Sequence, residues 1–359
     1  MKHYEQRLEH DLATIRSEIK DMGDRIQEAV KNAVYALLKD DGALASQTIL
    51  NDGYINRDMR RINYLCHAFV ARNVPSAGHL RRISAILRAN ISLERVGDYA
   101  VTICREQKQL QRPPHGVLAR DIELLADESR AMLHQAVTAF EQENADLAKG
   151  TVIMADRIEH TFSHIFPDLL ALSEDGECNL KEIFALLSAL NHLERISDQA
   201  KNICEETIFL VTGDEKPFKI YNILFVDPGN DSLSPMAEAI ARKAYPGSGN
   251  YSSGDPEPSE GLHPGMVDFM NRHGYDFTGV CPQPLSLSPE ELADLHVVVS
   301  LKGPVADYTG DIPFHTVDLE WELTPPGPGS DDADWEEVYQ HLLLNIRQLM
   351  EALRGKEAP

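Results

Sequence analysis

The first 210 residues place apolar side chains at helical spacing. One such stripe recurs every three or four positions and comprises Leu8, Leu12, Ile15, Ile19, Met22 and Ile26. Spacing of this kind puts apolar side chains on one face of an α-helix. Similar stripes follow in residues 54–73, 79–107, 117–143, 146–171 and 180–210. This region is therefore predicted to form about six amphipathic helices, packed as antiparallel bundles.

Short polar or proline-containing segments separate these stripes. They are residues 40–42, Pro75, residues 112–114 and residues 173–176. Connections this short join neighbouring helices of a bundle. The predicted fold of this region is all-α, with one three-helix bundle in residues 1–110 and a second in residues 111–213.

The pattern changes after Gly213. Residues 223–226 read ILFV, a short β-branched and aromatic run, and a loop to Ser234 and a helical stretch follow it. Residues 297–299 read VVV and form a second predicted strand. Alternation of strand and helix is typical of a parallel sheet. Residues 220–355 are therefore predicted to form a small α/β domain.

The helical region contains an internal repeat at an offset of 100 residues. Residues 91–107 read ISLERVGDYAVTICREQ and residues 191–207 read NHLERISDQAKNICEET, and 8 of these 17 positions are identical. Self-similarity at a fixed period indicates a duplicated structural unit. Each unit contains about 100 residues and three predicted helices.

Each copy of the repeat contains a pair of carboxylates four residues apart. Glu94 and Asp98 form the first pair, and Glu194 and Asp198 form the second. This spacing brings both groups to one helical face, where they repel each other unless a cation lies between them. Oxygen-rich clusters in helical bundles hold iron, manganese, zinc or magnesium. The four carboxylates are therefore predicted metal ligands.

Two other interpretations of these segments stay open. Arg95 and Arg195 lie between the carboxylates in sequence, so each run could instead be a solvated face or an intrahelical ion pair. Cys104 and Cys204 also recur in the two copies, and buried thiols pack well in helices. Both cysteines are therefore predicted to be core residues.

The repeated segments resemble the signature of the PhoU family. Residues 93–100 read LERVGDYA and residues 193–200 read LERISDQA, both similar to the family's LERIGD-A motif. Residues 52–56, DGYIN, resemble its D-x-x-I-D motif, with Asn56 where Asp is usual. Residues 74–81 resemble its P-x-A-x-D-L-R segment, with His79 replacing the acid. Residues 155–159 are a weaker counterpart in the second unit.

The resemblance covers residues 1–213 and carries several implications. PhoU proteins are paired three-helix bundles that bind metals through these motifs, which adds Asp52 and Glu159 as possible ligands. Asn56 and His79 could ligate through oxygen or nitrogen, with a lower charge. The family damps phosphate-starvation signalling by contacting a sensor histidine kinase and the ATPase of a phosphate ABC transporter. A homo-oligomer is also expected.

The last third of the chain resembles low-molecular-weight tyrosine phosphatases and thioredoxin-type arsenate reductases. Residues 223–239 read ILFVDPGNDSLSPMAEA, which is similar to that family's first strand, phosphate-binding loop and first helix. His263-Pro264 and residues 270–276 resemble a later segment of the family. The resemblance covers residues 220–353.

Three positions depart from the phosphatase pattern. Asp227 stands where the nucleophilic Cys is expected, and Leu233 where the phosphate-binding Arg is expected. Pro325 stands where the general-acid Asp is expected. A thiolate, a guanidinium and a proton donor are each needed for the reaction. The domain is therefore predicted not to be an enzyme, and Asp227 to cap the loop internally.

Two alternatives remain open at this point. The domain could be a phosphatase or arsenate reductase with a displaced catalytic residue, for which Cys281 is the only cysteine available. The helical region could instead be a metal-free scaffold. Hydrolysis of an aryl phosphate above a Cys281→Ser control, and metal analysis, would separate these cases.

Charge and composition narrow the possible partners and location. The formal net charge is −23. Residues 214–359 contribute most of it, with 9 Lys and Arg against 25 Asp and Glu. Such acidity disfavours nucleic acid and anionic lipid as partners. Scattered cysteines, no visible signal peptide and no apolar run long enough to span a bilayer predict a cytoplasmic protein without direct membrane insertion.

Overall fold

The computed structural model describes residues 2–174, 179–214, 219–313, 315–327 and 332–355. Cys178 and part of the predicted connection at 173–176 lie outside these residues, as do residues 215–218 between the predicted helical and α/β regions. The chain divides into two compact units, Met1–Lys216 and Pro217–Pro359.

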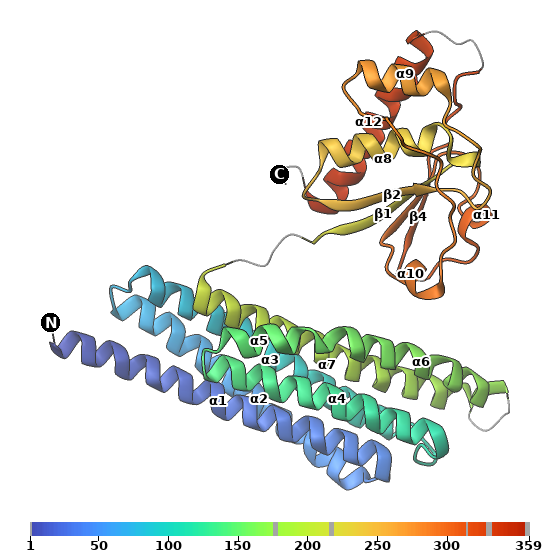
Figure 1. The fold of residues 1–359 in the computed structure, drawn as a ribbon. Coiled ribbons are helices and arrows are strands. Elements are labelled where there is room, and N and C mark those ends of the chain that lie inside the picture. The colour runs from blue at the N-terminus through green and yellow to red at the C-terminus, as the bar shows by residue number, and fades with distance from the viewer. Residues whose placement is uncertain (1, 175–178, 215–218, 314, 328–331, 356–359) are drawn as a thin grey trace. The chain divides into compact units, whose positions relative to one another are not determined.

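The described residues of the first unit form helices joined by short connections (Figure 1). They are α1 (Lys2–Lys39), α2 (Gly42–Arg72), α3 (Ala77–Gln107), α4 (Gly116–Glu141), α5 (Ala145–Val152), α6 (Met154–Glu174) and α7 (Leu180–Thr212). Helices α1 to α3 pack against one another as one bundle, and α4 to α7 as another. The prediction of duplicated three-helix bundles is confirmed, with one helix of the second bundle divided.

The division between α5 and α6 falls inside a stripe that was predicted to be one helix. The stripe spans residues 146–171, whereas α5 ends at Val152 and α6 begins at Met154. Residues 150–153 read GTVI. Glycine and β-branched residues all lower helix propensity, so this run is a weak point in the helix.

Side chains at the helix ends fix where several helices begin. Ser76 accepts a hydrogen bond from the His79 backbone, and His79 Nδ1 accepts one from the Ser76 backbone at 3.2 Å. Asn179 and Glu182 form the equivalent reciprocal pair at the start of α7. These are capping boxes, which satisfy backbone donors that have no partner inside the helix. His79 therefore serves as a cap residue of α3.

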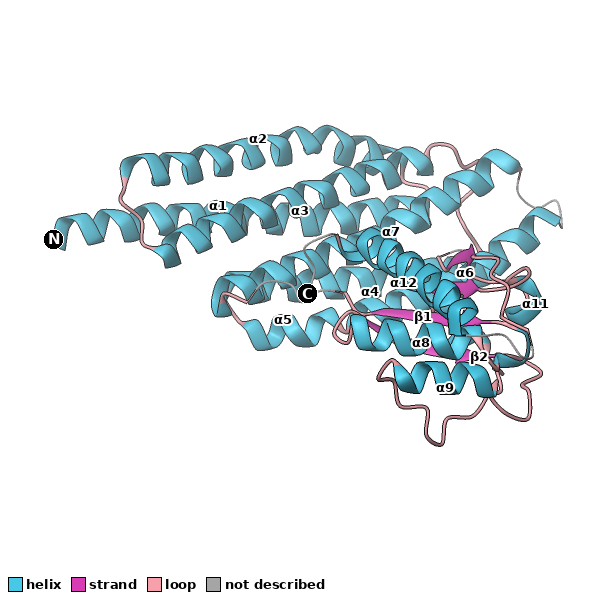
Figure 2. Ribbon diagram, turned by 90° about the horizontal axis from the view of Figure 1, so that it is seen from above, coloured by secondary structure: helices cyan, strands magenta, loops and turns pink. Residues whose placement is uncertain are grey.

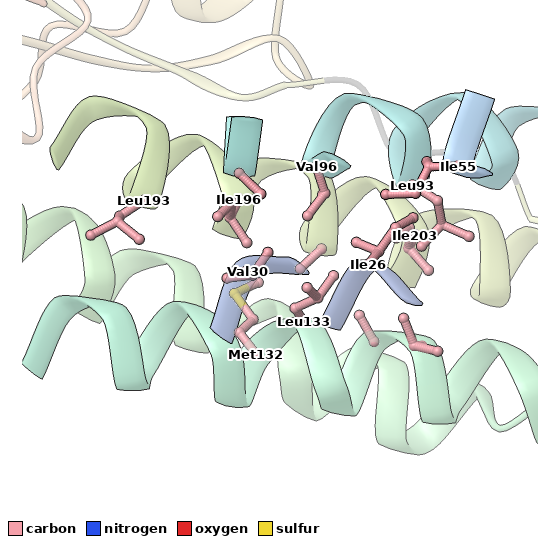
Figure 3. Packing of buried hydrophobic residues seen from close by; sticks show 14 of the residues in the cluster. Ile26, Val30, Ile55, Leu93, Val96, Met132, Leu133, Leu193, Ile196 and Ile203 are labelled. Atoms are coloured by element: carbon pink, nitrogen blue, oxygen red, sulfur yellow. The ribbon is translucent and has the colours of Figure 1, made fainter. Parts of the chain in front are cut away.

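One continuous apolar core runs through both helical bundles (Figure 3). The stripe residues predicted on α1, including Leu12 and Ile26, are buried in it. Val96 of the first repeat and Ile196 of the second are fully buried in the same cluster. Helices α3 and α7, which carry the repeated motif, pack against each other. The repeats therefore share their core.

The second unit is built on a four-stranded parallel sheet (Figure 2). Its strands are β1 (Tyr221–Val226), β2 (Gly249–Gly254), β3 (Val297–Ser300) and β4 (Val317–Glu320), in the order β2-β1-β3-β4. The described helices are η1 (Pro228–Asn230), α8 (Leu233–Ala244), α9 (Pro264–Arg272), α10 (Pro289–Ala293), α11 (Ala306–Thr309) and α12 (Asp332–Arg354). The predicted α/β domain with a parallel sheet is confirmed.

Helices cover both faces of this sheet. Ile223 and Phe225 of β1 pack in a core with α8, α9 and α12, whereas Leu224 and Val226 face a smaller core that includes Val305. Side chains alternate between the faces of a strand, so a strand buried on both faces must be apolar throughout. This explains the uninterrupted ILFV run. None of the described helices is long and apolar enough to cross a membrane.

Candidate functional site

The two repeated carboxylate pairs lie in equivalent surroundings on α3 and α7. Glu94 and Glu194 are half-buried, and Asp98 and Asp198 are exposed one turn later. The intervening Val96 and Ile196 are fully buried in the core. The pairs therefore lie at the edge of the core, with each glutamate partly withdrawn from water.

Asp52 of α2 joins the first pair. Gly97 lies opposite it, because a Cβ on Gly97 would come within 3.8 Å of Asp52 Oδ1 and 3.2 Å of Ile55. The small residue in the LERVGD run thus lets α2 approach α3 closely. Asn56 donates a hydrogen bond from Nδ2 to Asp52 Oδ2 at 2.6 Å. The first cluster therefore contains Asp52, Glu94 and Asp98, with Asn56 holding one carboxylate.

Burial and mutual repulsion act on these carboxylates. Burial and then the charge of Asp98 raise the pKa of Asp52. Burial, Asp98 and Asp52 raise the pKa of Glu94. A raised pKa of this origin marks acidic groups whose negative charge is not fully compensated by a nearby positive charge. The predicted first cluster is therefore electrostatically coupled across two helices.

The second cluster shows the same pattern more strongly. Burial raises the pKa of Glu194 to about 7, and the charges of Asp198 and Glu159 add to the shift. Glu159 comes from α6, so this cluster too draws on two helices. Each repeat thus brings three carboxylates into mutual influence, two from its LER motif and one from a neighbouring helix.

In neither cluster do the carboxylates surround a position that a metal ion could occupy. In the part of the chain that the structure describes, no three His, Cys, Asp or Glu side chains form a group that could hold an ion. Arg95 and Arg195 are exposed, and their charges only partly offset the rise in the pKa of the adjacent glutamates. The donor chemistry suits a hard cation, because carboxylate oxygens are its preferred ligands. His79, at the start of α3, is committed to its cap.

The loop after β1 has the shape of an anion-binding loop. It passes through Gly229 at φ 80° and Asn230 at φ 49° before α8 begins at Leu233. A Cβ on Gly229 would lie 2.3 Å from Ser259 Oγ, and the positive φ strains any other residue, so glycine is favoured there. The Gly229 carbonyl also accepts a hydrogen bond from the Ser259 backbone at 2.8 Å. The loop is therefore held against the segment after β2.

The carboxylate of Asp227 accepts hydrogen bonds from two donors at this loop. Its Oδ2 accepts a hydrogen bond from the Leu233 backbone N–H at 2.9 Å, and its Oδ1 accepts one from Ser234 Oγ at 2.5 Å. Backbone N–H groups at a helix N-terminus are the groups that bind an external anion. The protein's own carboxylate occupies this position, and the predicted internal cap is confirmed.

Asn230 extends the same network. Its Nδ2 donates to Ser234 Oγ at 2.7 Å, and its Oδ1 accepts a hydrogen bond from the Gln283 backbone at 2.7 Å. Asn230 and Ser234 are fully buried. In the sequence, both residues are only part of a motif match. Their hydrogen bonds to each other, to Asp227 and to Gln283 depend on the tertiary structure.

Asp227 lies in a buried environment. Burial raises the pKa of Asp227 to about 6, against the lowering effect of its hydrogen bonds to Ser234 and Leu233. Leu233, the first residue of α8, is fully buried in the core of the second unit. The position expected to hold a phosphate-binding Arg thus contributes an apolar side chain to the core.

Cys281 lines a cleft of about 840 Å³ in the second unit, together with Asn230 of the loop after β1. It is exposed, and its thiol contacts the Gly279 carbonyl at 3.9 Å. Arg242 also lines this cleft but bonds to Glu238 and to the Tyr251 carbonyl. No base activates the thiol in these described contacts. The other described cysteines are buried and free, as predicted for Cys104 and Cys204.

Similarity to known proteins identifies the family of this chain. The PhoU domain model matches residues 19–106 and 122–207. A phosphate-specific transport system accessory protein PhoU homolog of Pseudomonas putida is 32% identical over 216 residues, which are 59% of this chain and 84% of that protein. The chain belongs to the PhoU family. The accessory protein PhoU of Escherichia coli is 26% identical over 214 residues, covering 60% of this chain and 89% of its own.

A solved structure agrees with this assignment. The crystal structure of PhoU from Pseudomonas aeruginosa aligns with a TM-score of 0.55 and 31% identity, covering 57% of this chain and 99% of that one. The LER runs of the two repeats, residues 93–95 and 193–195, fall within the residues that the PhoU domain model matches. The low molecular weight phosphotyrosine protein phosphatase model matches residues 222–358. The chain therefore joins a duplicated PhoU region to a phosphatase-like domain.

Proposed function

We propose that this protein is a regulatory accessory protein of a phosphate-specific transport system. The observation that carries the proposal is its relation to PhoU proteins, whose named role is accessory to such a system. By the same relation, its partners are the transporter's ATPase and a sensor histidine kinase. Binding of both partners is assigned to the helical region, which contains the whole of the PhoU match.

Capture of partners from the native host tests this proposal. The tagged full-length chain, expressed at native abundance with ample phosphate, is expected to retain the transporter ATPase or a sensor histidine kinase. The chain shortened after residue 213 serves as the second arm and shows whether the phosphatase-like domain is needed. Recovery of neither partner with well-folded full-length protein would contradict the proposal.

The phosphatase-like domain is proposed to act without catalysis. Asp227 replaces the nucleophile, and its carboxylate binds the donors that a phosphate would need. A negative charge in the loop also repels a phosphate dianion. Aryl phosphate hydrolysis by the purified protein, at a rate above that of a Cys281→Ser variant, would overturn this part of the proposal.

Metal binding at the carboxylate clusters is also proposed. The three carboxylates of each cluster are not gathered around one point in this structure, so they would have to converge on the ion: Asp52, Glu94 and Asp98 on one, and Glu159, Glu194 and Asp198 on the other. A divalent or trivalent ion, such as magnesium, manganese, iron or zinc, would place positive charge beside Glu94 and Glu194, whose pKa values are raised by burial and by neighbouring carboxylates. Neighbouring carboxylates repel one another, and a bound cation reduces that repulsion. The raised pKa values of Glu94 and Glu194 support this view.

Equilibrium dialysis with Mn²⁺ measures this binding directly. The double variants Glu94→Gln/Asp98→Asn and Glu194→Gln/Asp198→Asn should each bind less Mn²⁺ than the unaltered protein. The matched control is Glu9→Gln/Asp24→Asn, which removes two carboxylates of α1 from outside both clusters. Equal Mn²⁺ binding by all four proteins would exclude the carboxylate clusters as metal sites.

A further inference from the structure

Helix α6 presents two histidines one turn apart, outside the residues assigned to the proposed function. His160 and His164 are both exposed. Their Nε2 atoms lie 3.1 Å apart, and their ring centroids are separated by 4.3 Å. Residues four apart share one helical face, so the backbone itself holds the two imidazoles together.

The distance between the two nitrogens is that of two ligands on one metal ion. Zinc–imidazole bonds are about 2.0–2.1 Å long, so two of them at an angle between about 90° and 110° place their nitrogens about 2.9–3.4 Å apart. The observed 3.1 Å lies inside this range. We propose that His160 and His164 form a binding site for a transition-metal ion that favours imidazole, such as Zn²⁺, Ni²⁺ or Cu²⁺.

The pair is arranged for binding before the ion arrives. In the absence of an ion, a single hydrogen bond between the two rings accounts for their contact. A metal replaces that one hydrogen bond by two coordinate bonds. The donor ring changes tautomer, losing its Nε2 proton to solvent and taking one from solvent at Nδ1, so that both imidazoles stay neutral. Little side-chain entropy is lost, since the two rings already face each other.

The chemistry of this site separates it from the carboxylate clusters. Imidazole nitrogen selects zinc, copper and nickel, whereas carboxylate oxygen selects magnesium and manganese. Within the described ranges, no third His, Cys, Asp or Glu completes a group around the pair. Among the described residues the pair therefore supplies two protein ligands, and water or a donor group of another molecule can complete the coordination.

Equilibrium dialysis of the untagged full-length protein against Ni²⁺ alone tests the proposal. A polyhistidine tag must be absent because it binds the same ion. The variants His160→Asn and His164→Asn should each lose one equivalent of bound Ni²⁺ relative to the unaltered protein. Both substitutions fall on the exposed face of α6, and far-UV circular dichroism verifies that the helices remain folded.

Two control variants isolate the histidine pair. His134→Asn removes another exposed histidine, whose ring bonds to Gln27 instead of a second imidazole, and should bind Ni²⁺ like the unaltered protein. Glu194→Gln/Asp198→Asn should also retain the equivalent, which separates this site from the second carboxylate cluster. Unchanged Ni²⁺ binding in either His160→Asn or His164→Asn would overturn the proposal, because the two rings must act together.

Discussion

Single residues decide what the loop after β1 can do. Asp227 is buried, yet both of its carboxylate oxygens accept hydrogen bonds, from the Leu233 N–H and from Ser234. A buried carboxylate without such partners would strongly destabilise the fold. Asp227 therefore keeps the loop intact while its carboxylate occupies the anion position. Leu233, the first residue of α8, packs into the core.

The raised pKa of Asp227 predicts a pH-dependent contribution to stability. The folded protein keeps this proton up to about pH 6, whereas the unfolded chain releases it near 3.8. Relative to Asp227→Asn, the free energy of unfolding should therefore fall as pH rises from about 4 to about 6, by up to about 2–3 kcal/mol. Urea unfolding followed by tryptophan fluorescence measures this change.

Tryptophan fluorescence is suited to this measurement because both tryptophans, Trp321 and Trp335, belong to the second unit. Asp268→Asn, which alters an exposed carboxylate of α9, serves as the control and should show no such trend. A stability difference between the unaltered protein and Asp227→Asn that stays constant over this pH range would refute the prediction.

At the scale of elements, the repeat makes α3 and α7 equivalent parts of one core. Both helices direct their LER apolar residues inward and their carboxylates to the core edge. An ion pair between Arg88 of α3 and Glu206 of α7, at 2.7 Å, ties them together at the surface. The repeated helices thus set the position of both proposed metal clusters, since each cluster takes two of its three carboxylates from them.

Truncation of a core residue on α7 should weaken the whole helical unit. Ile196→Ala removes buried atoms from a fully packed site and is expected to lower the free energy of unfolding by about 2–5 kcal/mol. Leu50→Ala, at a side chain that is 78% exposed, is the control and should change it by less than about 0.5 kcal/mol. Urea unfolding followed by far-UV circular dichroism, which reports mainly on helices, distinguishes the two results.

At the scale of the molecule, two units with separate cores share one chain. The helical unit buries a single apolar cluster, and the α/β unit buries one on each face of its sheet. Most of the net negative charge belongs to the α/β unit, Pro217–Pro359, with its 23 acidic and 8 basic residues. A surface of this kind favours a basic partner over nucleic acid. In the capture experiment, partners that the α/β unit recruits should therefore be released by added salt.

A comparison of the full chain with the chain shortened after residue 213 checks this whole-molecule prediction. A partner that needs the α/β unit should elute earlier in a salt gradient than one retained by the helical unit alone, because screening weakens interactions between exposed charges. Elution of such a partner only under denaturing conditions would argue instead for an apolar contact.

The amino-acid sequence alone determined the element types, the duplication and the motif positions. Apolar spacing distinguishes helix from strand locally, so it assigns Leu12 and Ile26 to the core and the ILFV run to a buried strand. The division of α5 from α6 was missed because weak propensity at residues 150–153 competes with a periodicity that continues across it.

Only the tertiary structure decided which distant residues meet. It placed Asp52 beside Gly97 and the Glu94 pair, gave Asp227 its partners, and assigned His79 to a helix cap. The His160–His164 pair is visible in the sequence as an i,i+4 spacing, but the facing of its rings depends on side-chain conformation. Local pattern fixes which face a side chain takes, whereas the packing of one helix or loop on another fixes its neighbours.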